Sequence, residues 1–99
     1  HEDTNYMVKR VIGLPGESLE YKNQELYIND KKVEEDYLDD DVVMEDIDKV
    51  TIPSDSYYVL GDNRAHSTDS REFGFIKKNQ ILGQPMLVFW PLSHIKVVK

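Results

Sequence analysis

Apolar and polar residues alternate along much of the chain, a pattern that predicts β-strands with one buried face. Residues 6–14 read YMVKRVIGL, so a strand here places Met7, Lys9 and Val11 on one face. The following Leu-Pro-Gly at 14–16 predicts a turn, because Pro fixes φ and Gly accepts a positive φ. The chain therefore opens with a strand that carries a charged lysine between two apolar residues.

Similar short patterns predict further strands at 19–21, 26–28, 32–33, 49–52, 57–60, 86–90 and 95–98. Asn29-Asp30 suits a tight hairpin turn. Residues 34–48 are strongly acidic, and their apolar positions fit no single period, so we expect a surface excursion at the edge of a cap. A short helical turn is expected at 77–80. The sequence predicts an all-β, mainly antiparallel fold, either an open barrel or two small sheets with a small cap.

Length and composition narrow the class of protein. A chain of 99 residues fits one domain, in which we expect residues 1–16 and 57–99 to form a catalytic core and residues 17–56 a small β cap. The net charge of −7 and the isoelectric point near 4.8 argue against nucleic acid as a partner, since binding phosphates needs a basic face. The chain has no cysteine and no apolar run of about 18 residues, so it contains no membrane-spanning segment of its own.

Lys9 is the first candidate for chemistry. If the face that it shares with Met7 and Val11 is buried, desolvation disfavours the ammonium and lowers the pKa of the amine. Such a lysine can act as general base for a serine nucleophile. The pattern alone equally fits a surface lysine whose stem covers apolar side chains.

Two longer motifs decide between these interpretations. Residues 9–17, KRVIGLPGE, resemble the segment of bacterial type I signal peptidases that carries their general-base lysine. Residues 61–74, GDNRAHSTDSREFG, resemble the second hallmark of that family. FWPLSHI at 89–95 resembles the strand and exit near its C-terminus. Most of the chain is thus similar to this family, and the resemblance implies its serine–lysine peptidase fold.

The resemblance assigns roles by position. It implies that Lys9 is the general base and that the Ser67 hydroxyl orients the lysine amine. Asp69 and Arg71 correspond to an ion pair that supports the site, and Arg10 is expected to pair with Asp62 or Asp69. The full set of expected supporting residues is Arg10, Gly61, Asp62, Asn63, Arg64, Asp69, Ser70 and Arg71. Read without the resemblance, the same loop is an ordinary run of turn and cap residues.

One departure from the family pattern matters most. The nucleophilic serine of the family lies in an S-M-x-P-like segment upstream of the lysine, and no such segment occurs in this sequence. We therefore expect a domain truncated at its N-terminus, whose fragment is inactive while its intact parent is a serine endopeptidase. A smaller departure is Glu17, where the family usually has Asp.

The resemblance also implies a biological role. The intact protein is expected to remove Ala-x-Ala-type signal peptides from exported preproteins, at the extracytoplasmic face of the cell membrane, to which transmembrane segments missing from this chain would anchor it. No cofactor is implied, and the Asp39–Asp41 run lacks the ligand spacing of a calcium loop, so no metal is expected. Two alternatives remain: a non-catalytic chaperone that binds extended peptides, and a repressor-type autoproteolytic serine–lysine protease.

Overall fold

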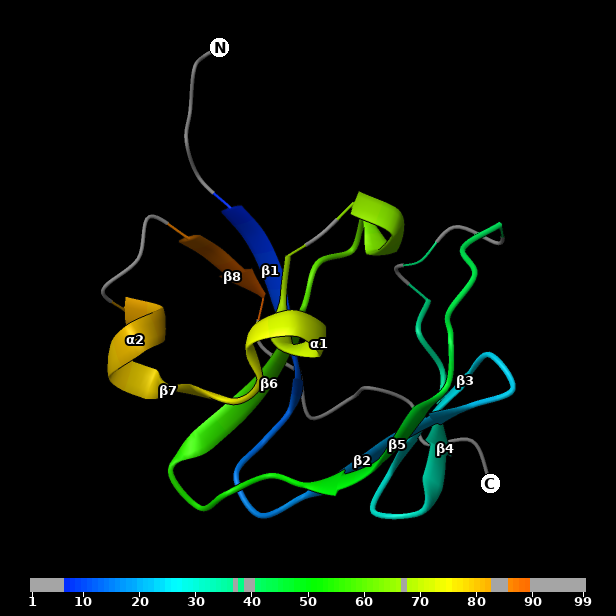
Figure 1. Cartoon of the computed structure of the whole chain (residues 1–99), viewed down its shortest axis with the longest axis horizontal. Coiled ribbons are helices and arrows are strands. Elements are labelled where there is room, and N and C mark those ends of the chain that lie inside the picture. The colour runs from blue at the N-terminus through cyan, green and yellow to red at the C-terminus, as the bar shows by residue number, and fades with distance from the viewer. Residues whose placement is uncertain (1–6, 37, 39–40, 67, 83–85, 90–99) are drawn as a thin grey trace, which may run out of the picture.

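In a computed structural model, two four-stranded sheets form the body of the protein (Figure 1). The structure describes residues 7–36, 38, 41–66, 68–82 and 86–89. The first sheet contains, in order, β7 (Ile76–Lys77), β6 (Ser56–Leu60), β1 (Met7–Gly13) and β8 (Met86–Phe89). The second contains β4 (Lys31–Val33), β3 (Glu25–Ile28), β2 (Ser18–Lys22) and β5 (Ile47–Thr51). The helical elements are η1 (Arg64–His66), α1 (Ser70–Phe73) and α2 (Lys78–Leu82).

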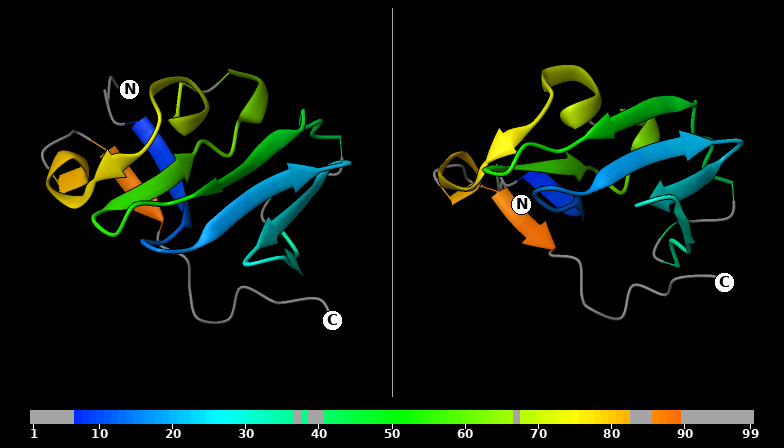
Figure 2. Two further views of the ribbon diagram at one scale, coloured as in Figure 1. Left: turned by 60° about the horizontal axis from the view of Figure 1, so that its bottom comes forward. Right: turned by 90° about the horizontal axis from the view of Figure 1, so that it is seen from below.

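The strand pairings confirm the expected fold class. Every described pair is antiparallel except β1 with β8, which is parallel and lies at the edge of the first sheet (Figure 2). β1 therefore lies in the middle of its sheet, between β6 and β8. A strand hydrogen-bonded on both sides is a rigid platform for a functional side chain.

Two tight hairpins build the second sheet. Asn23 and Gln24 connect β2 to β3 with φ of 53° and 72°, and Asn29 and Asp30 connect β3 to β4 with φ of 53° and 67°. Positive φ at both central positions matches the right-handed twist of the flanking strands. The hairpin expected at Asn29-Asp30 is confirmed.

A short connection joins the two sheets. Gly16, with φ of 84°, occupies the turn after β1, and its N–H donates to the Ile52 carbonyl at 2.8 Å. The Ile52 N–H donates in turn to the Glu17 carbonyl at 2.8 Å. Gly13, at the end of β1, lies so close to Ile52 that a Cβ there would be 2.2 Å from the Ile52 Cδ1 atom. Any larger residue at position 13 would therefore force the Ile52 side chain to move.

Apolar side chains form two clusters on opposite faces of the first sheet. The larger lies between the two sheets and comprises Ile12, Leu19, Tyr21, Leu26, Val33, Met44, Ile52, Tyr58 and Leu60. The smaller comprises Val11, Val59, Ile76 and Ile81. Alternate residues of β1 and β6 point to opposite clusters, as the period of two predicts.

Some elements differ from the sequence-based expectation. β5 begins at Ile47, two residues earlier than expected, and the helical turn is α2, which begins at Lys78. Within the acidic stretch, Met44 is 3% exposed and belongs to the larger cluster, so this residue is core and not surface. The expected strand at 95–98 lies outside the described residues.

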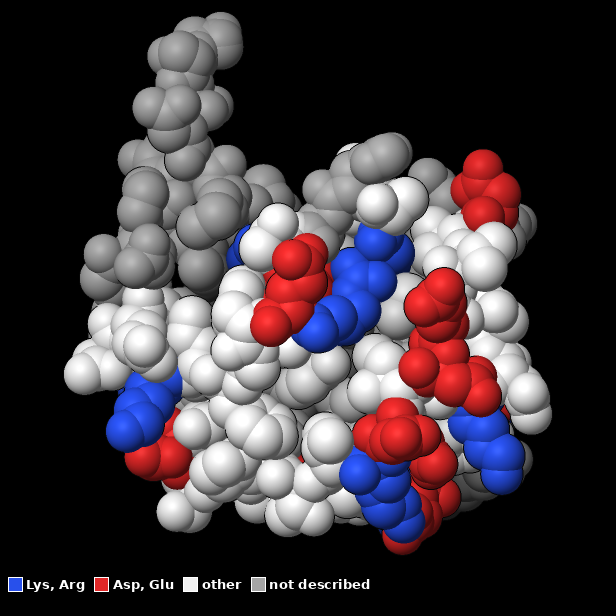
Figure 3. Space-filling model, viewed as in Figure 1, with Lys and Arg blue, Asp and Glu red and all other residues white. Residues whose placement is uncertain are grey.

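Charged side chains of both signs adjoin one another on the face shown in Figure 3. Two exposed ion pairs involve the second sheet and its β3–β4 turn: Lys32 with Glu25, at 2.5 Å, and Lys49 with Asp30. All four side chains are at least 40% exposed, so these pairs contribute little to stability.

Candidate active site

Lys9 is buried at the centre of the first sheet. It is 5% exposed and shares a face of β1 with Val11, which is fully buried. Its Nζ donates a hydrogen bond of 2.5 Å to the backbone carbonyl of Thr68, 59 residues away. The two motifs that are far apart in sequence therefore meet at this amine, and the surface interpretation of Lys9 is wrong.

Ser67 lies outside the described residues. Its neighbour Thr68 contacts the Lys9 amine through its carbonyl, so the loop passes the lysine at this point. The expectation that the Ser67 hydroxyl orients Lys9 stays a prediction.

Asp69 organises the loop around it. Its side chain is fully buried, and Oδ2 accepts hydrogen bonds from the Gly61 N–H at 3.0 Å and from Arg71 Nη2 at 2.8 Å. Oδ1 accepts from Arg71 Nε at 2.9 Å and from the Arg71 N–H at 3.1 Å, which makes Asp69 the N-cap of α1. Burial opposes ionisation, but the bonds from Arg71 and Gly61 outweigh it and lower the pKa of Asp69. The expected Asp69–Arg71 ion pair is present.

Arg10, the residue after Lys9 on β1, forms a bidentate ion pair with Asp62. Arg10 Nε donates to Oδ1 at 3.0 Å and Nη2 donates to Oδ2 at 2.8 Å. This geometry fixes the plane of both groups. Of the two partners expected for Arg10, the structure thus pairs it with Asp62, which anchors the start of the loop to β1.

The remaining predicted residues differ in their surroundings. The Ser70 hydroxyl is buried and accepts from the Val59 N–H at 2.8 Å, which joins α1 to β6. Asn63 is exposed, whereas Arg64 is 4% exposed. The pKa of Arg64 is raised, because Tyr21 and Glu35 favour its charge more than burial disfavours it. Sequence reasoning did not identify Tyr21 or Glu35 as partners of this loop, and no local pattern marks them.

Comparison with known proteins assigns this arrangement to a family. The model of the family described as "Signal peptidase, peptidase S26" matches residues 1–90. The chain belongs to this signal peptidase family. It is 42% identical over 98% of its length to signal peptidase I of Bacillus amyloliquefaciens, and 43% identical over 90% of its length to signal peptidase IB of Staphylococcus aureus.

A solved signal peptidase I from Enterococcus faecalis has the same fold, with a TM-score of 0.64 and 39% identity over 73% of this chain and 75% of that one. The chain spans 58% and 56% of the length of the Bacillus amyloliquefaciens and Staphylococcus aureus relatives. Membership of the signal peptidase family therefore rests on sequence and on fold together.

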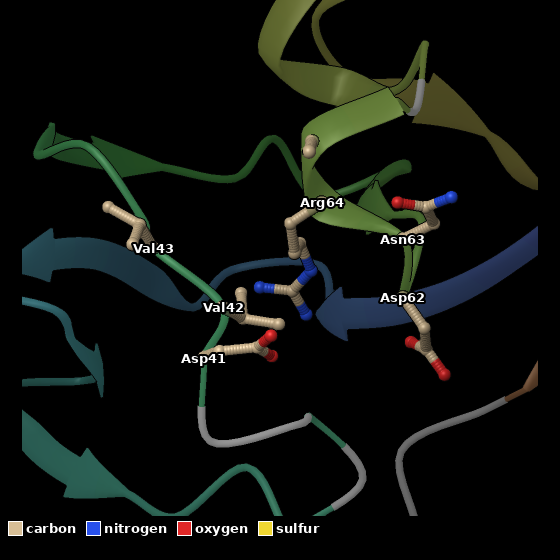
Figure 4. Close-up of a pocket in the computed structure, with 7 residues that line it drawn as sticks. Asp41, Val42, Val43, Asp62, Asn63 and Arg64 are labelled. Carbon is tan, nitrogen blue, oxygen red and sulfur yellow. The ribbon is translucent and has the colours of Figure 1, made fainter.

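Residues 62–65 of the second family motif line an open hollow of about 650 Å³, and the acidic stretch forms its other wall (Figure 4). Its lining residues are Asp41, Val42, Val43, Asp62, Asn63, Arg64 and Ala65. Figure 4 shows the Arg64 side chain reaching from the loop toward the segment that carries Val42. The loop of the signal peptidase motif is thus separated from the acidic stretch except where side chains bridge the space.

The described part of this family member shows two further features that bear on chemistry. None of its helices has the length and apolar character needed to cross a membrane. The same residues contain no group of three His, Cys, Asp or Glu side chains placed to hold a metal ion.

Proposed function

We propose that this chain is the lysine-bearing part of a peptidase that removes signal peptides from exported preproteins, with Lys9 as general base. The observation that carries the proposal is the position of the Lys9 amine, which is buried and bonded to the Thr68 carbonyl inside the second family motif. Lys9 is 5% exposed, and a buried lysine is the type of residue that replaces histidine beside a serine nucleophile.

The proposed chemistry needs a serine from outside these 99 residues. As that serine attacks the scissile carbonyl carbon, its hydroxyl proton moves to the unprotonated Lys9 amine, and the lysinium then protonates the leaving amine of the substrate. Water, activated by Lys9 in the same way, hydrolyses the acyl-enzyme. Ser67 is assigned to orient the amine between these transfers. Arg10, Asp62, Asp69 and Arg71 are assigned to hold the loop in place.

The proposed substrates are preproteins whose signal peptides carry small residues, of the Ala-x-Ala type, before the cleavage site. Such a segment binds in extended form, so backbone pairing supplies affinity and shallow pockets supply selectivity. We place the reaction at the extracytoplasmic face of the cell membrane, where exported chains emerge, with transmembrane anchors supplied by other parts of the protein.

Replacement of Lys9 tests the proposal. The chain is completed with the part of the Bacillus amyloliquefaciens signal peptidase I that it does not match, and cleavage of an Ala-x-Ala peptide is followed by mass spectrometry. Lys9→Ala should reduce kcat by at least ~1000-fold, because the attacking serine loses its base. Far-UV circular dichroism should show that the fold is kept.

Lys22→Ala is the matched control, since Lys22 lies on β2 and is exposed. This variant should cleave at the unmodified rate. Cleavage retained in folded Lys9→Ala protein would refute the assignment of the general base.

A further inference from the structure

The Arg64 side chain connects the loop at 61–69 to Tyr21 of β2 and to Glu35. Arg64 begins η1 in this loop, and it lines both the hollow of about 650 Å³ and a second hollow of about 530 Å³. The second hollow is walled on its far side by residues 43–47 of the acidic stretch. The Arg64 side chain therefore borders both open spaces, and Figure 4 shows it reaching from the loop toward the segment that carries Val42.

The Arg64 guanidinium makes hydrogen bonds to Glu35 and Tyr21. Arg64 Nη2 donates to Glu35 Oε2 at 2.9 Å, and Nη1 donates to the Tyr21 hydroxyl at 2.8 Å. The Tyr21 hydroxyl donates to the other Glu35 oxygen at 2.6 Å, so the three side chains close a ring of hydrogen bonds. The side chains of Arg64 and Glu35 are 1% and 9% exposed. We call the Glu35–Arg64 pair, with Tyr21, the strut.

The near end of the strut reaches the loop that contacts Lys9. Arg64 Nε donates to the Gly61 carbonyl at 2.8 Å, and Arg71 Nη2 donates to the Arg64 carbonyl at 2.9 Å. The same Arg71 nitrogen bonds Asp69, which lies directly after Thr68, the residue whose carbonyl accepts from the Lys9 amine. An unbroken series of bonds thus runs from Glu35 to the acceptor of the lysine.

A buried ion pair is weak evidence for stability, because desolvation offsets much of the attraction. Its directional bonds instead define one relative position of the groups that it joins. We propose that Glu35 and Tyr21, acting through Arg64, are positioning residues that hold the loop at 61–69 against Lys9. The proposal rests on the proposed function and deepens it, by adding Tyr21 of β2 and Glu35, which follows β4, to the support of its active site.

Acylation of Lys9 tests the position of the loop without relying on catalysis. The completed protein is pulsed with an acylating reagent well below its unfolding temperature, and modification of each lysine is followed by mass spectrometry. Glu35→Gln and Tyr21→Phe keep the shape of the side chains but weaken the ring. Each should raise the rate at Lys9 by ~5-fold or more, since a loosened loop exposes the amine, while the other lysines keep their rates.

Glu34→Gln is the matched control, because Glu34 is the exposed neighbour of Glu35. It should leave the rate at Lys9 unchanged. Unchanged labelling of Lys9 in both strut variants would overturn the proposal. So would an equal increase at every lysine, because that result indicates general loosening and no specific positioning. If Glu35→Gln does not fold, the milder Tyr21→Phe decides.

Kinetics of the same variants give a second, separable result. Displacement of the loop should lower kcat by ~10-fold and change KM by less than ~2-fold. The reason is that the strut does not contact Lys9 itself but orients the loop whose Thr68 carbonyl does. If the completed protein cleaves nothing, the proposed function fails, while the labelling of Lys9 still decides the strut. Cleavage with unaltered kcat in both variants would contradict a positioning role.

Discussion

At the scale of single residues, the Asp69 carboxylate holds several parts of the site together. Its two oxygens accept four hydrogen bonds, from the Gly61 N–H and from three nitrogens of Arg71. This buried carboxylate therefore binds the backbone directly after β6 and caps the N-terminus of α1. It also holds the neighbouring Thr68 beside Lys9. Because these bonds favour the charged form, the pKa of Asp69 is lowered although burial acts in the opposite direction.

Replacement of Asp69 should therefore reduce stability in a pH-dependent way. A carboxyl whose pKa is lower in the folded state than in the unfolded chain, where it is about 3.9, stabilises the fold above that value and stops doing so as pH falls through the folded pKa. Asp69→Asn should lower the free energy of unfolding by about 2–4 kcal/mol at pH 7, because it leaves Arg71 without its partner. The loss should shrink below about pH 4, as measured by urea unfolding.

Asp48→Asn provides the comparison, since Asp48 is exposed on β5. Asp48→Asn should change the free energy of unfolding by less than about 0.5 kcal/mol at both pH 7 and pH 3. A deficit of Asp69→Asn that is equal at pH 7 and pH 3 would show that charge is not the cause.

At the scale of elements, the tight hairpins decide how the second sheet is built. Asn29 and Asp30 both have positive φ, which costs an ordinary residue energy because its Cβ crowds the following carbonyl oxygen. Asn and Asp tolerate this conformation, and glycine adopts it without a steric penalty. The turn fixes the register of β3 with β4, where Ile28 faces Lys31.

Two substitutions at Asp30 isolate this backbone effect, because both remove the exposed bond to Lys49. Asp30→Gly should be more stable than Asp30→Ala by about 1 kcal/mol in thermal or urea unfolding. At Asp48, within the extended strand β5, the order should reverse, since glycine weakens a strand interior. Equal stability of the two Asp30 variants would mean that φ at this position does not control the hairpin.

At the scale of the whole molecule, the two sheets share one core. The larger cluster combines Ile12, Tyr58 and Leu60 of the first sheet with apolar residues of the second. Ile52 links them further, because its backbone bonds to Gly16 and Glu17 and its side chain is 1% exposed. We infer that the sheets unfold together.

Ile52→Ala should then lower the free energy of unfolding by about 2–5 kcal/mol, through lost burial and the cavity that remains. Unfolding by urea, followed by far-UV and by near-UV circular dichroism, should remain a single transition with coincident midpoints. Val43→Ala, at a side chain that is 75% exposed, should change stability by less than about 0.5 kcal/mol. Two separated transitions would show that the sheets are independent units.

Most of the fold could be read from local pattern. The strand predicted within 6–14, the Pro-Gly turn at 15–16 and the Asn29-Asp30 hairpin each depend on neighbours in the chain. The structure confirms the turn and the hairpin, and it shows β1 at Met7–Gly13. Met44 was misjudged, because the short apolar run Val42-Val43-Met44 within the acidic stretch fits no single period. Its burial depends on Gln24, whose side chain bonds both the N–H and the carbonyl of Met44.

The class of fold, the lysine between apolar residues and the residues of both motifs can be predicted from short segments of the chain. The folded structure is needed to see which side chains meet: the Lys9 amine at the Thr68 carbonyl, Arg10 at Asp62, and Arg64 at Glu35. These partners are far apart along the chain. Ion pairs and hydrogen bonds between remote residues depend on how the sheets pack. The local pattern of apolar and polar residues around one partner does not identify the other.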